Sequence, residues 1–355
     1  MEEPSRRSCW QRLAVGSHHI GQVAVGTAVG RERHLDLPGP RWYSVSNPDR
    51  CAGRHAGRFD TESPPLVGNY RPGRSGRAGM DALGRCERVS VRRLTEDQVH
   101  AAAAMLVALR EGRLALAGLP GDVTPEGTED VQRIIDAVSA RMDRQVRGWK
   151  IYTVYKPMHP PMSAPIYDVF PSGAEIPADI SPTRLIEPEI MFRVDRDLPV
   201  SDRNYEITEI MESVTAVIGF EVIGSRFRGT GGSDGEAPSA GQGSLYGSFS
   251  DHLANGCIIV GDSIPGWRRV AFEEVGLRLT EGDRELVSVV GCHPFDNPFL
   301  PVVVGVNRLR RRFGVKVGDI IVTNSSTSFF PVQAARMIRA AYEGLGEVTA
   351  TFASS

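Results

Sequence analysis

The sequence predicts an α+β fold, in which helices come first and are followed by many short strands. Two observations support this prediction. Between residues 94 and 142, apolar residues recur at helical spacing. From residue 149 onward, short runs rich in β-branched and aromatic residues alternate with glycine- and proline-rich turns. Strands and helices do not alternate regularly, so the pattern favours an α+β or β-rich roll over a βαβ fold.

Residues 1–90 are predicted to form a disordered extension. They contain 14 arginines, no lysine and nine acidic residues, and they lack hydrophobic periodicity. Such a segment cannot bury enough apolar area to offset the entropy that ordering would cost. A linker, or a true start at Met80, would explain the same composition. We place the folded domain at 91–355, with a flexible glycine- and serine-rich insertion at 228–247.

Two helices are predicted at the front of this domain. The first begins after Thr95, because Gln98 three residues later completes a capping-box pattern, and Gly112 is a suitable end. The second has its start signal at 124–126 and is expected to stop at Gly148. Its apolar stripe consists of Val131, Ile134, Ile135, Val138 and Met142.

The rest of the domain is predicted to be mainly strands. They are expected at 149–155, 184–195, 220–223, 257–261, 269–280, 285–290, 318–323 and 348–352. Glu281-Gly282-Asp283 is a turn signal that predicts a hairpin between two of them. Two helices are predicted among the strands, at 208–217 and at 301–313, the second of which ends at Gly314.

Charge and composition exclude several classes of protein. The net charge of −2 argues against a nucleic-acid or membrane-surface binder. No apolar run approaches the roughly 18 to 20 residues that span a bilayer, and no secretory signal is recognised. The five cysteines are odd in number and contain no C-x-x-C pair, so reduced thiols are favoured over disulfides or a zinc site. We therefore expect a cytoplasmic protein.

Two carboxylates stand out in the strand predicted at 184–195. Glu187 and Glu189 are two residues apart, so their side chains would project from the same face. Like charges on a half-buried face repel each other and lose hydration, and a hard divalent cation would offset both costs. Glu221, flanked by apolar residues in another predicted strand, is a possible third ligand. Three carboxylates suit Mg²⁺ or Mn²⁺.

The alternative is that these glutamates form ion pairs within the protein. Arg184, Arg193 and Arg226 lie close to them in the sequence and could supply the positive charge. A Glu-x-Glu pair on a strand occurs more often on a solvated or ion-paired face than in a metal site.

Five short segments resemble motifs of one enzyme group. They are Gly148-Trp149-Lys150-Ile151, Glu187-Pro188-Glu189-Ile190-Met191-Phe192, Glu221-Val222-Ile223-Gly224-Ser225-Arg226, Asp251-His252-Leu253-Ala254-Asn255 and Gly318-Asp319-Ile320-Ile321-Val322-Thr323-Asn324-Ser325. In this order, they resemble the fumarylacetoacetate hydrolase superfamily, and within it the 2-keto-4-pentenoate hydratase and 4-oxalocrotonate decarboxylase branch. The resemblance spans roughly 94 to 352. It implies N-terminal helices followed by a mixed β-sandwich or roll, the superfamily's C-terminal-domain type.

The resemblance also implies a role for each matched residue. Glu187, Glu189 and Glu221 would hold Mg²⁺ or Mn²⁺, which would bind the carboxylate and 2-oxo oxygens of a small 2-oxo acid. Lys150 would stabilise negative charge on the substrate or assist proton transfer. The alternative, which is commoner for lysine, is a surface side chain that extends its ammonium into solvent.

The remaining implied roles concern the substrate and the acid–base group. Thr323 and Ser325 would bind the substrate carboxylate, and the alternative is that their hydroxyls bond the backbone in a turn. Asp168 is the nearest candidate for a catalytic aspartate that the family places at about 170–173. His293 could line the pocket, but a structural loop histidine is the expected role.

The implied function is a metal-dependent hydratase that adds water to a 2-hydroxy-alka-2,4-dienoate to give a 4-hydroxy-2-oxo acid, in aromatic or related catabolism. The alternatives are a 4-oxalocrotonate-type decarboxylase, an acylpyruvate hydrolase and a non-catalytic binding or partner member. The resemblance further implies a homo-oligomer, or a complex with a related decarboxylase or hydratase subunit. Two departures from the family pattern favour the non-catalytic alternative: Tyr152 replaces a glycine in the Lys150 segment, and the aspartate near 170–173 is absent. Gly224 in place of an aspartate and Asn324 in place of a glycine are further departures.

Overall fold

The computed structural model describes most of the chain beyond residue 91. The described residues are 92–153, 160–181, 183–227, 245–291 and 293–354. The predicted disordered extension at 1–90 lies outside them, as does the predicted insertion at 228–247 apart from its last three residues. The domain boundary near residue 90 therefore stays a prediction.

The first helix, α2, spans Glu96–Arg110 and confirms the predicted capping box. The hydroxyl of Thr95 accepts a hydrogen bond from the backbone N–H of Gln98, whose side-chain oxygen accepts one from the backbone N–H of Thr95. Gly112, just after the helix, has a φ of 68°, a left-handed conformation that glycine adopts without steric cost. The signals predicted at both ends of this helix are therefore confirmed.

The second helix, α3, spans Thr128–Ser139, and both of its predicted ends were wrong. The hydroxyl of Thr124 does not cap the helix, because it donates to the carbonyls of Leu119 and Pro120. The helix stops nine residues before Gly148, which lies instead in a strand. The apolar stripe is buried as predicted, except for Met142 beyond the helix end.

An eight-stranded mixed sheet contains the strands that carry the candidate site. Its strands are β1 (Gly148–Tyr152), β2 (Met162–Ile166), β3 (Val169–Pro171), β5 (Leu185–Val194), β6 (Val214–Ile223), β7 (Asn255–Ser263), β10 (Ile320–Val322) and β11 (Phe330–Pro331). The order is β2-β1-β10-β5-β6-β7-β3, and β11 also pairs with β5. Of these, β2, β3 and β11 were not predicted, because each is short and contains a proline.

A second mixed sheet has five strands. They are β4 (Ala174–Ile176), β8 (Gly276–Glu281), β9 (Arg284–Val290), β12 (Met337–Tyr342) and β13 (Gly346–Phe352), in the order β4-β13-β12-β8-β9. The hairpin predicted at the Glu281-Gly282-Asp283 turn is confirmed, since β8 and β9 pair directly and Gly282 has a φ of 56°.

Short helical elements connect the strands. They are α4 (Ile207–Glu212), α5 (Leu245–Ser250), α6 (Phe299–Leu309) and the 3₁₀ turns η3 (His252–Ala254), η4 (Trp267–Arg269) and η5 (Phe272–Glu274). The helix predicted at 208–217 was wrong in its second half, where β6 begins at Val214. The β-branched residues from Val214 onward pair with β5 along its length, so tertiary pairing overrides the helical pattern. The predicted strand at 269–280 likewise begins only at Gly276.

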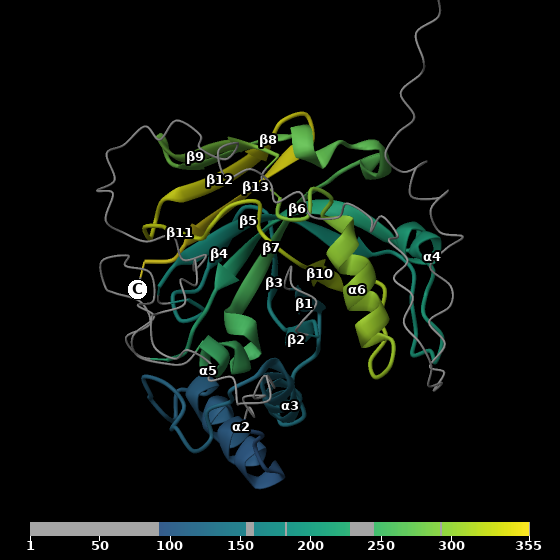
Figure 1. The fold of residues 1–355 in the computed structure, drawn as a ribbon. Coiled ribbons are helices and arrows are strands. Elements are labelled where there is room, and N and C mark those ends of the chain that lie inside the picture. The colour runs from purple at the N-terminus through teal and green to yellow at the C-terminus, as the bar shows by residue number, and fades with distance from the viewer. Residues whose placement is uncertain (1–91, 154–159, 182, 228–244, 292, 355) are drawn as a thin grey trace, which may run out of the picture.

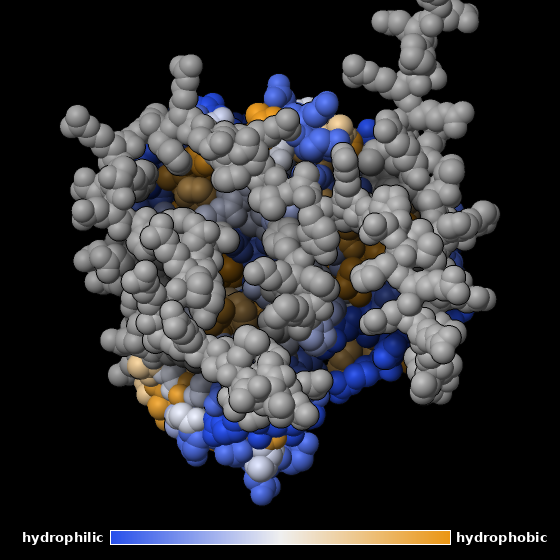
Figure 2. All heavy atoms as spheres, viewed as in Figure 1, coloured by the Kyte–Doolittle hydropathy of each residue, from blue (hydrophilic) through white to orange (hydrophobic). Residues whose placement is uncertain are grey.

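The main core lies between the two sheets, which Figure 1 shows one above the other, with α6 beside them and α2, α3 and α5 below. Ile190 and Phe192 of β5 belong to this core together with Phe220 of β6. Figure 2 shows hydrophilic residues predominating on this face where α2 and α3 lie. None of the helices in the described ranges has the length and apolar character needed to cross a membrane. The α+β prediction is confirmed.

The central strand β5 lacks a neighbouring strand along part of one edge. On that edge it pairs with β11 at 185–186 and with β10 at 192–193, and the described pairings leave 187–191 without a strand partner. The loop that follows β10 fills this place, because Ser325 in that loop donates a hydrogen bond to the carbonyl of Pro188.

Candidate metal centre

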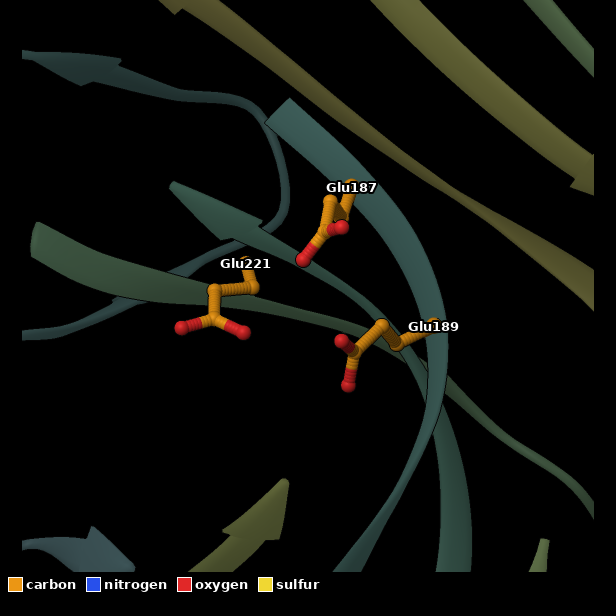
Figure 3. A group of neighbouring side chains, drawn as sticks. All are labelled: Glu187, Glu189 and Glu221. Carbon is orange, nitrogen blue, oxygen red and sulfur yellow. The ribbon is translucent and has the colours of Figure 1, made fainter. Parts of the chain in front are cut away.

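The three candidate glutamates lie on two adjacent strands. Glu187 and Glu221 are direct partners in the antiparallel β5–β6 ladder, and Glu189 is two residues further along β5 on the same face. One carboxylate oxygen from each residue lies within 4.8 Å of the others. Figure 3 shows the three side chains extending from their strands toward a common space. Strand pairing therefore joins residues that are 34 positions apart in the sequence.

Burial and mutual repulsion raise the pKa values of two of these carboxyl groups. Glu189 and Glu221 are 1% and 0% exposed, and Glu187 is partly buried. Burial, followed by the charge of Glu221, raises the pKa of Glu187 to about 7. The same causes, with the charge of Glu187 added, raise the pKa of Glu189 well above its ordinary value. The cluster therefore holds more negative charge than its surroundings favour.

Lys150 of β1 supplies a positive charge inside the cluster. Its ammonium nitrogen lies 2.7 Å from Oε1 of Glu221 and donates to the carbonyl of Leu253 at 3.1 Å. Burial alone would lower the pKa of Lys150, but the nearby carboxylates, Glu221 first among them, raise it above its ordinary value. Lys150 is therefore a buried cation next to one glutamate and not a lysine extended into solvent.

The arrangement of free oxygen atoms fits a hard divalent cation. The amide of Asn255 donates to Oε1 of Glu221 at 2.8 Å, so this oxygen already has two partners. Among the described residues, Oε2 of Glu221 and Oε2 of Glu189 are buried and accept no hydrogen bond. Buried acceptors without partners are costly, and oxygen-rich clusters of this kind suit Mg²⁺ or Mn²⁺.

The arginines considered as alternative partners bond elsewhere. Arg184 donates to the carbonyl of Val332, and Arg193 pairs with Asp195. Arg226 donates to the carbonyls of Gly224 and Asn255. In the described part of the chain, the lysine of β1 is the cation that contacts the cluster.

The other predicted site residues differ in their surroundings. Thr323 follows β10 beside the cluster, where its backbone N–H donates to Glu189 and its hydroxyl is buried without a partner. The hydroxyl of Ser325, by contrast, bonds backbone at Pro188 and Thr327. Asp168 lies between β2 and β3 and forms a 2.6 Å ion pair with Arg144. The structure therefore brings Thr323 to the glutamates and gives Asp168 a different partner.

Two contributors to the site were missed from the sequence. Asn255 lies within a segment recognised as similar to the family, but its amide was given no role. The carbonyl of Leu253 carries no side-chain signal at all. Gly224, which replaces an aspartate of the family, is explained by space: a Cβ atom there would lie 2.6 Å from Cα of Gly256 and 2.9 Å from the carbonyl oxygen of Ile180.

His293 is buried, and the structural role expected of it stays a prediction. It is 3% exposed, in the loop before α6, and its Nδ1 accepts a hydrogen bond from the backbone N–H of Phe295. Burial lowers the pKa of His293 to about 4, so the imidazole is neutral in the folded protein at pH 7.

Solved structures similar to this fold include enzymes that carry metals. The structure of 4-oxalocrotonate decarboxylase from Pseudomonas putida G7 complexed with magnesium and adipate has a TM-score of 0.59 and 19% sequence identity, over 74% of this chain and 99% of that chain. The same values hold for its complex with calcium and acetate. No protein-family model matches the sequence.

A weaker likeness is to fumarylpyruvate hydrolase from Pseudomonas aeruginosa in complex with Mn²⁺ and pyruvate. Its TM-score is 0.39 and its identity 13%, over 60% of this chain and 93% of that chain, which is too low to support an argument about function. The decarboxylase comparison confirms the fold that the motifs implied, because this chain shares its fold with that enzyme. At 19% identity, it does not by itself establish what this chain does.

Proposed function

We propose that this chain, with the fold just described, is a divalent-metal-dependent lyase acting on unsaturated 2-oxo acids. The observation that supports the proposal most directly is the buried cluster of Glu187, Glu189 and Glu221, with two carboxylate oxygens free of hydrogen bonds. A bound Mg²⁺ or Mn²⁺ would supply a Lewis acid that stabilises negative charge on the oxygens of a 2-oxo acid. The catalytic domain would be 91–355.

The residues around the cluster would bind and orient the substrate. The ammonium of Lys150 is buried beside Glu221, where it can stabilise negative charge on a substrate oxygen or hold a proton for transfer. The free hydroxyl of Thr323 can donate a hydrogen bond to a substrate carboxylate. Ser325 is proposed to support the loop that carries Thr323, since its hydroxyl already bonds the backbone.

The first candidate reaction is hydration of a 2-hydroxy-alka-2,4-dienoate. The dienol takes up a proton at C5 and loses its enol proton, which gives a 2-oxo-3-alkenoate. The oxygen of water then bonds to C4, a proton is added at C3, and the product is a 4-hydroxy-2-oxo acid. These steps need a group that moves protons, and Lys150 is the described residue of the cluster best placed for it.

The second candidate is decarboxylation of a 4-oxalocrotonate-type diacid, and two observations favour it. The similar structure with a TM-score of 0.59 is a decarboxylase. Asp168, the expected acid–base residue, is paired with Arg144. Decarboxylation breaks the bond to the departing carboxylate and moves its electron pair toward the 2-oxo group, so it needs an electron sink more than it needs general-base activation of water.

Two substrates separate these reactions. The protein would be incubated with Mg²⁺ and either 2-hydroxypentadienoate or 4-oxalocrotonate, while dienol absorbance and released CO₂ are followed. Loss of dienol without CO₂ identifies the hydratase, and CO₂ from the diacid identifies the decarboxylase. The Glu189→Gln variant is the control, since turnover that survives this change does not depend on the cluster. No turnover of either substrate would contradict both candidates. Assembly as a homo-oligomer, or with a related subunit, stays a prediction.

A further inference from the structure

Three consecutive residues next to the cluster have left-handed backbone conformations. The φ values of His252, Leu253 and Ala254 are 48°, 56° and 57°, and none of these residues is glycine. This conformation brings Cβ too close to the following carbonyl oxygen, so L-residues visit it rarely and usually one at a time. A run of three must be held by its surroundings, and such segments concentrate where a protein positions functional groups.

The left-handed run places two polar groups against the glutamate cluster. The carbonyl of Leu253 accepts a hydrogen bond from the ammonium of Lys150 at 3.1 Å. Asn255, the next residue after the run, donates its amide N–H to Oε1 of Glu221 at 2.8 Å. Lys150 also lies 2.7 Å from this same oxygen. One short segment therefore contacts both the buried cation and the carboxylate that it neutralises.

The segment is anchored at both of its ends. Before it, Asp251 forms a 2.6 Å ion pair with Arg110 of α2, and their side chains are only 2% and 7% exposed. After it, the carbonyl of Asn255 accepts a hydrogen bond from Nη1 of Arg226 at 2.7 Å. One buried ion pair thus connects α2 to the segment that contacts the cluster.

We propose that the segment His252–Asn255 is a positioning device for Glu221 and Lys150. Its two hydrogen bonds hold Lys150 and Oε1 of Glu221 in place, so that Oε2 of Glu221 is the oxygen left to bind a cation. Glu221 then binds the cation through one oxygen only. The inference rests on the proposed function, because it assigns roles around the same metal site. Asn255 and Leu253 act through the ligand and the lysine, without touching the cation.

The first test compares two asparagines. Asn255→Ala removes the donor to Glu221 and is expected to lower Mn²⁺ affinity by about 10- to 100-fold, the usual effect of losing a group that orients a metal ligand. Asn307→Ala is the matched control, because Asn307 makes two comparable hydrogen bonds to the backbone of Tyr205. Its Mn²⁺ affinity should stay within about twofold of the unchanged protein. Affinity would be measured by Mn²⁺ EPR titration of the full chain, with circular dichroism as the folding check.

The second test addresses the left-handed backbone at Ala254, which is partly exposed. Glycine adopts this conformation without steric cost, whereas a β-branched residue resists it. Ala254→Gly should therefore keep Mn²⁺ affinity within about twofold, and Ala254→Val should lower it by roughly tenfold. Valine adds only two carbons at this partly exposed position, so the variant is expected to fold. A folded Ala254→Val protein with unchanged Mn²⁺ affinity would contradict the proposal.

A double-mutant cycle separates positioning from general loss of structure. In a Glu221→Asp background, the shorter side chain keeps a carboxylate but withdraws it from the Asn255 amide, so Asn255→Ala should have little further effect on Mn²⁺ affinity. Equal losses in both backgrounds would overturn the positioning role. If the unchanged protein binds no Mn²⁺, the proposed function fails, and this role fails with it. If that protein binds Mn²⁺ and Asn255→Ala binds it equally well, only the positioning role fails.

Discussion

The ammonium of Lys150 lies 2.7 Å from Oε1 of Glu221, and both groups are buried. This pair places one positive charge among three carboxylates, so the cluster is under-neutralised without a further cation. Burial of this excess negative charge is costly, which explains why the pKa of Glu187 rises to about 7. The pair therefore partly neutralises the site and leaves room for a divalent ion.

Replacing Glu189 with Gln should abolish metal binding. The change removes a ligand with a free buried oxygen and keeps the side chain's size. The loss of affinity should exceed the roughly 10- to 100-fold effect that is typical of losing a residue that hydrogen-bonds a metal ligand. The metal-free protein should be no less stable, because one of three repelling charges is gone. Calorimetric titration with Mn²⁺ measures the affinity, and Glu285→Gln, on the exposed pair with Arg278, is the control. Unchanged affinity would refute the ligand assignment.

Metal affinity should fall as the pH drops below about 7. The pKa of Glu187, raised by burial and by Glu221 to about 7, means that a cation must displace a proton from the cluster at lower pH. Titrations at pH 6 and pH 8, each in two buffers with different ionisation enthalpies, would measure the protons released. Metal binding should release more protons at pH 6 than at pH 8. An affinity that does not change between these pH values would mean that Glu187 is not a ligand.

Lys150→Met should destabilise the metal-free protein and abolish turnover. It leaves Glu221 buried without its ion-pair partner, and breaking a buried pair in this way typically costs about 3–5 kcal/mol. Saturating Mg²⁺ should restore part of that stability. Urea unfolding with and without Mg²⁺ is the measurement. Lys316→Met, at an exposed lysine, should change stability by less than about 0.5 kcal/mol. A variant as stable as the unchanged protein would show that the ion pair contributes little.

The buried imidazole of His293 should make the protein less stable in acid. Burial lowers its pKa to about 4 in the folded state, against an ordinary value of 6.5. Below pH 6.5 the unfolded chain takes up a proton that the folded protein does not, so stability falls as the pH drops toward 4. The contribution lost by pH 4.5 is about 2–3 kcal/mol.

His293→Gln should remove this pH-dependent contribution. Urea unfolding gives the free energy of unfolding of both proteins at pH 7.5 and pH 4.5. The change in this free energy between the two pH values should be smaller in the variant, since every other titrating group is shared. An equal change in unfolding free energy with pH in the two proteins would contradict the prediction.

Thr323→Val and Ser325→Ala should have opposite effects, the first on KM and the second on stability. The hydroxyl of Thr323 is buried without a partner, so its removal should not lower stability but should raise KM for the substrate. The hydroxyl of Ser325 bonds the carbonyl of Pro188 and the N–H of Thr327, so its loss should cost about 1 kcal/mol of stability. Steady-state kinetics and thermal unfolding distinguish the two. A stability loss in Thr323→Val with unchanged KM would reverse the assignment.

The spacing of Glu187 and Glu189 was enough to predict that they share a face, because the side-chain period of a strand is fixed. The strand pairing that brings Glu221 opposite Glu187 is a long-range relation that spacing cannot supply. The apolar flanks of Glu221 and the family resemblance indicated only that it could be a third ligand. Resemblance likewise placed Lys150, although its partner Glu221 became clear only in the structure.

Other features were out of reach for the sequence. The C-terminal half of the helix predicted at 208–217 has a weak helical pattern, and pairing with β5 converts it to strand. The contribution of Leu253 is a backbone carbonyl, which leaves no trace in residue type. The predicted role of Asp168 depends on its position in the chain, whereas its pairing with Arg144 is a contact between residues 24 positions apart.

The direct pairing of Glu187 with Glu221 ties metal binding to the alignment of two strands. A slip of one residue between β5 and β6 would turn one strand's side chains to the opposite face, and its carboxylates would no longer meet those of the other strand. A cation that needs all three would bind only the correctly aligned chain. Metal added during refolding should therefore select the native alignment over its shifted competitors, and the yield of correctly folded protein would depend on the ion.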